Sequence, residues 1–281
     1  MEIMKIDDLY GLYVKCFPNY LCIKDTFETF LKPQQAAIYT EYNKDKLIAY
    51  TIVWGNSISL LCVNPEYQNK GIGTKLLYKA ESHIQKNNPS KILLGRGSHY
   101  LLQGVPESNV KAVQFFKKFG YTASWTSVNM KLDLKIFNYN MLKIPVPSSN
   151  ISFRYAEPSD MNALLTSVDN TQPEWHNIFT TCIDPVLLAI ESDTNCILGF
   201  EILSFNGGRF IKNAGCIGCV GVITSARNKG IGRQMVAKGA EIFKSHGLKS
   251  IELRYVYLVD WYKALGFEIT DSQWMGEKLI K

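Results

Sequence analysis

The sequence predicts an α+β fold made of two related domains in tandem. The chain has 281 residues, which is long enough for two compact domains that each bury a core. A run of five residues occurs at Asn69 and again at Asn228, 159 positions later. A composition of 46% hydrophobic and 20% charged residues is typical of a globular protein and excludes a disordered chain or a coiled coil.

The first domain is expected to begin directly at a helix near Asp7, without a preceding strand. Its repeated unit is a strand, a short loop, a Gly-x-Gly turn and a helix. The apolar run 60–63 predicts the strand, and a helical stripe after the turn predicts the helix through Ile72, Leu76, Leu77, Ala80 and Ile84. A further strand at 91–94, a long Gly-rich loop at 95–106 and a helix before Gly120 follow.

A Pro/Ser-rich segment at 144–150 predicts a linker, so we place the domains at 1–143 and 151–281. The second domain opens with a strand at 151–155 and a helix start at Pro158, and further strands are expected at 197–205 and 251–257. Its apolar run 219–222 precedes the second Gly-x-Gly turn. A second repeated segment contains Gly120 in the first domain and Gly266 in the second. Gly120 lies 49 residues after Gly71, and Gly266 lies 36 residues after Gly230. The first domain therefore carries the longer connection.

Composition also narrows the class of protein. The net charge is +6 and the basic residues are dispersed, which disfavours nucleic acid. The acidic start lacks the features of a secretory signal, and no apolar run reaches the roughly 18 residues of a membrane span. Seven cysteines, an odd number, favour reduced thiols in the cytoplasm. The Cys216-x-x-Cys219 pair has no second pair to complete a metal site, so no metal is expected.

Each Gly-x-Gly turn at a helix start predicts an anion site. Glycines let a ligand approach the backbone, and the amides of the first helical turn favour negative charge. Basic residues at both turns fit a phosphate: Lys70, Lys75, Lys229 and Arg233. The spacing excludes a P-loop and the dinucleotide fingerprint, because Leu76 and Met235 stand where the latter has its third glycine. The alternative is a glycine that only eases a tight turn.

The two turns resemble the acetyl-CoA signature of the GNAT N-acetyltransferase superfamily. The matching residues are Gln68-x-x-Gly71-x-Gly73 and Arg227-x-x-Gly230-x-Gly232, and the segments 116–121 and 262–267 resemble the family's second signature. The resemblance covers nearly the whole chain. It implies two tandem GNAT-like domains, each a twisted mixed sheet flanked by helices, with acetyl-CoA as cosubstrate.

In that family the pyrophosphate lies on amides of the turn, and the end of the preceding strand bonds to the pantetheine arm. Carried onto this chain, the resemblance implies two sets of acetyl-CoA contacts. They are Val63, Gln68, Asn69, Lys70, Gly71, Ile72, Gly73, Thr74 and Asn109 in the first domain, and Val222, Arg227, Asn228, Lys229, Gly230, Ile231, Gly232 and Arg233 in the second.

The resemblance also implies a tyrosine that protonates the departing thiolate. The second domain has Tyr262 at this position, whereas the first has Phe116, so we expect chemistry in the second domain. The second signature is incomplete there too, because Tyr255 replaces its asparagine. Tyr262 as a core aromatic is the alternative. Candidate bases for the amine proton are Glu201 and Asp260, with Glu252 as a further option; Asp260 also suits the first turn of a helix.

The resemblance thus implies transfer of acetyl to a primary amine by direct attack in a ternary complex. The loop at 97–106 resembles one in tandem GNAT proteins that acetylate glucosamine or glucosaminides, so an amino sugar is the preferred acceptor. Peptide, polyamine and antibiotic amines are alternatives, and so is a non-catalytic CoA-binding sensor or scaffold. We expect a monomer with two pseudo-symmetric domains or a homodimer, acting on a small molecule and not on a membrane.

Overall fold

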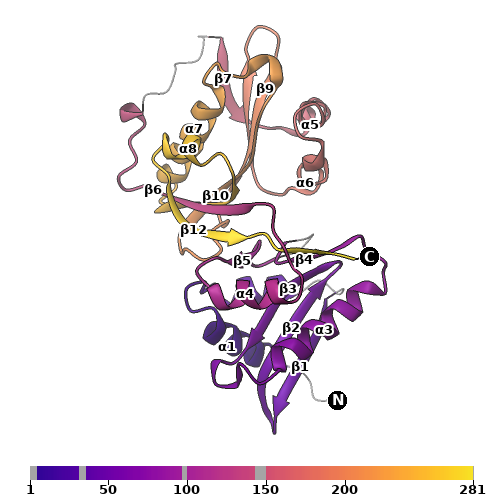
Figure 1. The fold of residues 1–281 in the computed structure, drawn as a ribbon. Coiled ribbons are helices and arrows are strands. Elements are labelled where there is room, and N and C mark those ends of the chain that lie inside the picture. Colours follow the sequence, from indigo (N-terminus) through magenta and orange to yellow (C-terminus); the bar gives the residue numbers. More distant parts are fainter. Residues whose placement is uncertain (1–4, 32–35, 97–99, 143–149, 281) are drawn as a thin grey trace. The chain divides into compact units, whose positions relative to one another are not determined.

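The fold was analysed in a computed structural model, which describes residues 5–31, 36–96, 100–142 and 150–280. The chain divides into two compact units. Unit 1 comprises Met1–Asn129 and Asp271–Lys281, and unit 2 comprises Met130–Thr270. Figure 1 shows both units, each a sheet with helices beside it. The predicted α+β class is confirmed.

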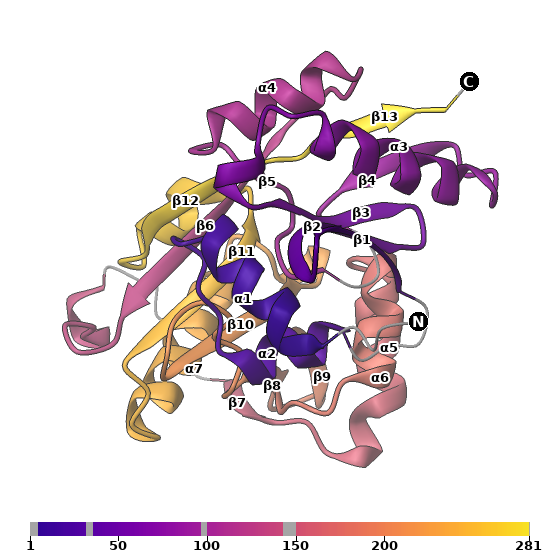
Figure 2. The same ribbon diagram turned by 90° about the horizontal axis from the view of Figure 1, so that it is seen from below.

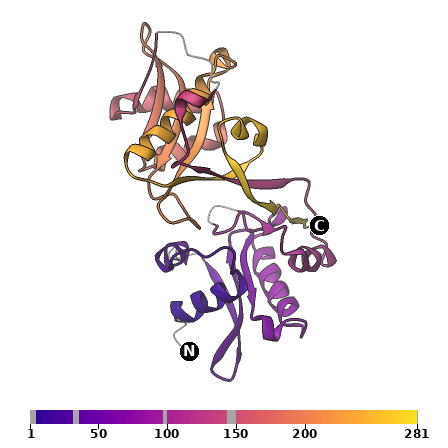
Figure 3. The same ribbon diagram turned by 90° about the vertical axis from the view of Figure 1, so that its left-hand side faces the viewer.

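Unit 1 is built on a five-stranded mixed sheet. Its order is β1-β2-β3-β4-β13, in which β3 and β4 are parallel and the other pairs antiparallel. Helices α1 and α3 lie on opposite sides of this sheet (Figure 3). The elements are α1 (Ile6–Cys16), α2 (Lys24–Leu31), β1 (Ala37–Asn43), β2 (Lys46–Trp54), β3 (Ser57–Val63), η1 (Pro65–Tyr67), α3 (Ile72–Gln85), β4 (Lys91–Leu94), β5 (Val105–Pro106), α4 (Val110–Lys118) and β13 (Glu277–Leu279).

Unit 2 repeats this plan with one more strand at the start. Its strands run in the order β6-β11-β10-β9-β8-β7, with β10 and β11 parallel. The elements are β6 (Thr126–Asp133), η2 (Tyr139–Met141), β7 (Ile151–Tyr155), η3 (Pro158–Asp160), α5 (Met161–Asp169), η4 (Pro173–Trp175), α6 (His176–Thr181), β8 (Val186–Glu191), β9 (Cys196–Ser204), β10 (Ala214–Val222), η5 (Thr224–Ala226), α7 (Ile231–Ser245), β11 (Ser250–Val256), α8 (Val259–Lys263) and β12 (Glu268–Trp274).

Strand alternation explains why helices cover both faces of the unit 2 sheet. Leu188 and Phe200 point to one face and pack with residues of α5 and α6. Their chain neighbours point to the other face, where Ala189 packs with α7 and Gly199 lies against Met235 of that helix. The strands are buried on both faces, so their sequence reads as continuous apolar runs and not as alternating ones.

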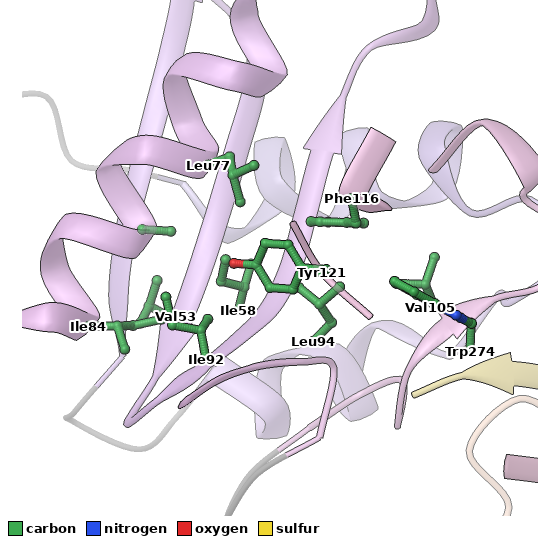
Figure 4. Packing of buried hydrophobic residues seen from close by; sticks show 11 residues of the cluster. Val53, Ile58, Leu77, Ile84, Ile92, Leu94, Val105, Phe116, Tyr121 and Trp274 are labelled. Atoms are coloured by element: carbon green, nitrogen blue, oxygen red, sulfur yellow. The ribbon is translucent and has the colours of Figure 1, made fainter. Parts of the chain in front are cut away.

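The C-terminal segment belongs to unit 1, not to unit 2. Strand β13 pairs antiparallel with β4, in register Lys278 to Ile92, and lies beside it in Figure 2. Trp274 joins the unit 1 core with Phe116 and Tyr121 (Figure 4). The ammonium of Lys278 also pairs with the carboxylate of the buried Glu81 at 2.9 Å, so the buried negative charge has a partner of opposite charge.

The compact units therefore differ from the predicted domains 1–143 and 151–281. The division falls inside β6 and β12 because these strands carry the chain from one unit to the other. A single boundary at the Pro/Ser-rich segment cannot describe these units, because unit 2 begins before that segment and the C-terminal residues belong to unit 1. Most of the predicted linker, residues 144–149, lies outside the described residues.

Most predicted elements are confirmed. The described part of unit 1 begins at helix α1 without a preceding strand, and the expected strands at 91–94 and 151–155 are β4 and β7. The long Gly-rich loop expected at 95–106 is largely packed into the protein. Its residues 101–106 are buried, and β5 within it pairs with β12 through Pro106 and Gln273. Residues 97–99, including His99, lie outside the described residues.

Candidate functional site

Both Gly-x-Gly turns adopt the same backbone. Gly71 and Gly230 each have a φ of 80°, which is in the left-handed region that favours glycine, and each lies at the N-terminus of a long helix. The asparagines two positions earlier are also left-handed, with φ of 61° at Asn69 and 63° at Asn228. The sequence repeat is therefore a repeat of conformation, and it presents the first amides of α3 and α7 at the turn.

A side chain ties each turn back to the strand before it. In unit 1 the amide of Gln68 donates to the Val63 carbonyl at 3.1 Å, and in unit 2 the Nε of Arg227 donates to the Val222 carbonyl, also at 3.1 Å. This bond explains why the signature accepts either glutamine or arginine at its first position. Each side chain closes the loop between the strand and the helix.

A cavity of about 670 Å³ opens at the unit 2 turn. Its wall includes seven of the eight predicted acetyl-CoA contacts of this unit: Val222, Arg227, Asn228, Gly230, Ile231, Gly232 and Arg233. Lys229 is the exception. Tyr262 lines the same cavity, together with the aromatic side chains of Trp175, Tyr257 and Trp261. Turn amides and two arginines fit a ligand that carries phosphate groups.

The predicted contacts of unit 1 form a similar turn on a more exposed surface. The four residues from Gln68 to Gly71 are exposed, while Val63, Ile72, Gly73 and Thr74 are half-buried. Lys70 donates to the Glu66 carbonyl at 3.0 Å and lies over the ring of Tyr67. Asn109 caps α4 by accepting from the Ala112 amide at 3.1 Å, so its side chain has a structural task.

Tyr262 and Phe116 occupy equivalent places. The ring of Tyr262 meets Phe267 edge-on at 5.5 Å, and the ring of Phe116 meets Tyr121 in the same way at 5.5 Å. Phe116 is buried in the unit 1 core, whereas Tyr262 is half-buried and lines the cavity. Burial, and then the nearby Glu201 carboxyl, raise the pKa of Tyr262, so its phenol keeps its proton at neutral pH.

Glu201 is a fully buried acid on β9. Neither carboxyl oxygen has a hydrogen-bond partner among the described residues, and burial raises the pKa to about 8. Gly239 of α7 makes room for it, because a Cβ there would lie 2.7 Å from its Oε1. The counterpart in unit 1 is Thr51, whose hydroxyl donates to the Leu60 carbonyl. A glutamate in an otherwise apolar strand was the sequence signal for this feature.

The other two candidate bases have different surroundings. Asp260 lies in the first turn of α8 with a side chain 99% exposed, near Lys263 at 3.7 Å, and it does not line the cavity. Glu252 accepts from the backbone amides of Arg209 and Phe210 and pairs with Arg254 at 2.7 Å. None of the three acids lines the cavity. Glu201 is the one whose carboxyl raises the pKa of Tyr262 and lacks a hydrogen-bond partner among the described residues.

Backbone strain also occurs on β10 and β11, whose ends lead into the wall of the cavity, and sequence patterns did not show it. Cys219 on β10 has a φ of 51° and Tyr255 on β11 a φ of 62°, both unusual for residues with side chains. The pairing of β10 with β9 shifts register between Gly218 and Gly221, which is a bulge. In the described residues of β3 and β4, no non-glycine residue has a positive φ. Such strain is concentrated at functional sites.

Two family models match the chain, one in each half. Residues 34–123 match an acetyltransferase (GNAT) domain, and residues 157–267 match the acetyltransferase (GNAT) family. The chain belongs to the GNAT family. It carries two GNAT domains in tandem, and the expected resemblance is confirmed. A curated relative, mycothiol acetyltransferase of Renibacterium salmoninarum, is 26% identical over 238 residues, or 76% of this chain and 65% of the relative. The chain thus spans less than two thirds of that protein.

Solved GNAT structures share this fold over nearly the whole chain. A GCN5-related glucosamine N-acetyltransferase region of a fungal multi-domain GH3 β-N-acetylglucosaminidase has a TM-score of 0.84 and 22% identity, and the match covers 97% of this chain and 36% of the other. A tandem GNAT protein from the clavulanic acid biosynthesis pathway has a TM-score of 0.75 and 14% identity, with 98% and 94% covered. These likenesses show the tandem GNAT fold.

None of the described helices combines the length and apolar character that a membrane crossing requires. Within the same residues, no group of three or more His, Cys, Asp or Glu side chains is placed to hold a metal ion.

Proposed function

We propose that this GNAT protein is an acetyl-CoA-dependent N-acetyltransferase whose chemistry takes place in unit 2. The observation that carries the proposal is the cavity that unites the Gly-rich turn with Tyr262. The strained strands beside Tyr262 support it, because unit 1 lacks both the strain in its equivalent strands and the tyrosine. The turn of unit 1 is proposed as a second acetyl-CoA contact or as a support of the fold.

The proposed reaction is direct attack in a ternary complex. Acetyl-CoA supplies the acetyl group as a thioester, and a primary amine attacks the carbonyl carbon as the carbon–sulfur bond breaks. Arg227, Arg233 and the turn amides hold the phosphates. Tyr262 donates its phenolic proton to the departing sulfur, and Glu201 is proposed as the final acceptor of the amine proton. Its pKa of about 8 is close to the range in which a general base works best.

An amino sugar is the proposed acceptor. The cavity is lined by the rings of Trp175, Tyr257 and Trp261, and aromatic faces suit the flat side of a sugar ring. Its lining within the described part of the chain contains two arginines and no carboxylate, so it offers little to a polyamine, which carries several positive charges. The glucosamine N-acetyltransferase region among the similar structures agrees with this choice.

A panel of amines tests the acceptor. Release of free thiol from acetyl-CoA is measured with glucosamine, a glucosaminide, spermidine, a lysine peptide and an aminoglycoside. We expect the highest kcat/KM with glucosamine or the glucosaminide, because neither places a second cation in the cavity. A higher kcat/KM for spermidine, the lysine peptide or the aminoglycoside antibiotic would contradict the amino-sugar proposal and identify that class of amine as the acceptor.

The second candidate is a CoA-binding sensor or scaffold, which the incomplete second signatures favour: Phe116 in one unit and Tyr255 in the other break the pattern. Thermal stabilisation by CoA without turnover of any amine in the panel would support it.

For either function we propose a cytoplasmic protein, because seven free cysteines agree with a reducing compartment. We also propose that the protein is a monomer or a homodimer in solution.

A further inference from the structure

Two cysteine side chains meet at the end of the strand that leads to the unit 1 turn. Cys16 is the last residue of α1, and its thiol donates to the Val63 carbonyl at 3.4 Å. Cys62 precedes Val63 on β3, is fully buried, and lies opposite Tyr50 of β2. Helix α1 packs on β2 and β3, so both thiols lie between this helix and the sheet.

Helix register places Cys16 at the edge of the unit 1 turn. The buried residues Leu9 and Tyr13 of α1 correspond to Leu164 and Val168 of α5, and the same offset matches Cys16 to Thr171. Thr171 lines the unit 2 cavity. Cys16 is half-buried, whereas Cys62 is fully buried, so Cys16 is the more accessible of the two residues.

We propose that Cys16 and Cys62 form a peroxide-sensitive dithiol, with Cys16 as the attacking thiol and Cys62 as the resolving thiol. In the first step the Cys16 thiolate attacks one oxygen of hydrogen peroxide, the O–O bond breaks, and a sulfenic acid and water form. In the second step the Cys62 sulfur attacks the Cys16 sulfur, the S–O bond breaks, and a second water leaves. The two thiols together lose two electrons to one peroxide.

The surroundings assign the two roles. The hydrogen bond with the neighbouring Cys62 side chain is the largest influence on Cys16 and lowers its pKa against the effect of burial, and the positive charge of Lys15 acts in the same direction. Burial raises the pKa of Cys62. Thiolates and not thiols react with peroxide, so oxidation begins at the half-buried Cys16. Sensor cysteines of this kind have a low pKa, partial access and a resolving cysteine nearby.

The test is peptide mapping of the whole protein after treatment with stoichiometric hydrogen peroxide. We expect the wild type to lose about 2 Da per oxidised pair and to yield one new cross-linked peptide that joins residues 16 and 62 under non-reducing conditions. The disulfide would also remove the thiol proton that bonds to Val63. Cys62→Ser should abolish the cross-link and leave a sulfenic acid on Cys16 that dimedone labels.

A matched variant separates this site from general thiol oxidation. Cys196 is exposed, and Cys196→Ser should leave the cross-link unchanged. Because Cys62→Ser alters the core, Cys16→Ser at the half-buried position is the second variant, and it should abolish both the cross-link and the dimedone label. Oxidation of Cys196 without a link between residues 16 and 62 would overturn the proposal. So would a dimedone label in Cys16→Ser as strong as that in Cys62→Ser. Acetyl transfer by unit 2 does not enter either readout.

Discussion

Replacing Tyr262 by phenylalanine is expected to lower kcat for acetyl transfer by about 10²- to 10⁴-fold, the usual contribution of a general acid. The variant keeps the ring that packs against Phe267 and removes only the hydroxyl, so the free energy of unfolding should change little. Since burial and Glu201 raise the pKa of this phenol, the wild-type rate should not fall between pH 7 and 9 through loss of its proton. The measurement is free-thiol release at saturating acetyl-CoA and glucosamine.

Tyr155→Phe provides the control for this variant. Tyr155 lies on β7 of the same unit, is exposed, and does not line the cavity. Removal of its hydroxyl should leave kcat unchanged. Equal rates in the wild type and Tyr262→Phe would exclude Tyr262 as the proton donor and leave it the role of a cavity wall.

Glu201 should make the protein less stable as pH rises. Its carboxyl has an ordinary pKa of 4.5 when unfolded and of about 8 when folded, so the folded state holds the proton longer. The stabilisation that the protonated Glu201 contributes is therefore fully present below pH 4.5 and is lost as pH rises toward 8. The difference amounts to as much as about 5 kcal/mol at about 1.4 kcal/mol per pKa unit. Glu201→Gln cannot ionise and should lose this dependence.

Thermal unfolding from pH 5 to pH 8 measures this effect. The Tm of Glu201→Gln should rise relative to that of the wild type across this range. Glu268→Gln, at an exposed position of β12, is the control for loss of a carboxyl and should follow the wild type. A constant Tm difference between the wild type and Glu201→Gln at all pH values would show that the buried carboxyl does not titrate in this window.

The paired turns could be predicted from the sequence because they depend on local chemistry. Gly71 and Gly230 need a left-handed backbone, and the apolar stripes behind them need a helix, so a short segment determines both. The bond from Gln68 or Arg227 to the strand end is local in the same sense. Local repeats thus predicted the fold class and the wall of the cavity.

Long-range pairing could not be predicted in this way. Nothing near Lys278 in the sequence indicates that its strand pairs with β4 or that its ammonium meets Glu81. Cys219 lies within the bulge of β10, and Tyr255 lies on β11 beyond the residues that pair with β10, which no single residue of the sequence reports. The missing partners of Glu201 depend on the packing of α7 at Gly239. The sequence named these residues but not their surroundings.

One comparison tests most directly whether unit 2 holds the acetyl-CoA that reacts. Gly230→Ala and Gly71→Ala are matched, because each glycine has a φ of 80° and lies at the N-terminus of the helix that follows its turn. Each alanine should disfavour the left-handed turn by about 1–2 kcal/mol, so the free turn relaxes and must regain its backbone conformation when acetyl-CoA binds. We predict that the KM for acetyl-CoA rises about 10-fold in Gly230→Ala, as that strain converts at 1.4 kcal/mol per factor of ten, and less in Gly71→Ala. A larger rise in Gly71→Ala would place the reacting acetyl-CoA in unit 1 and contradict the account.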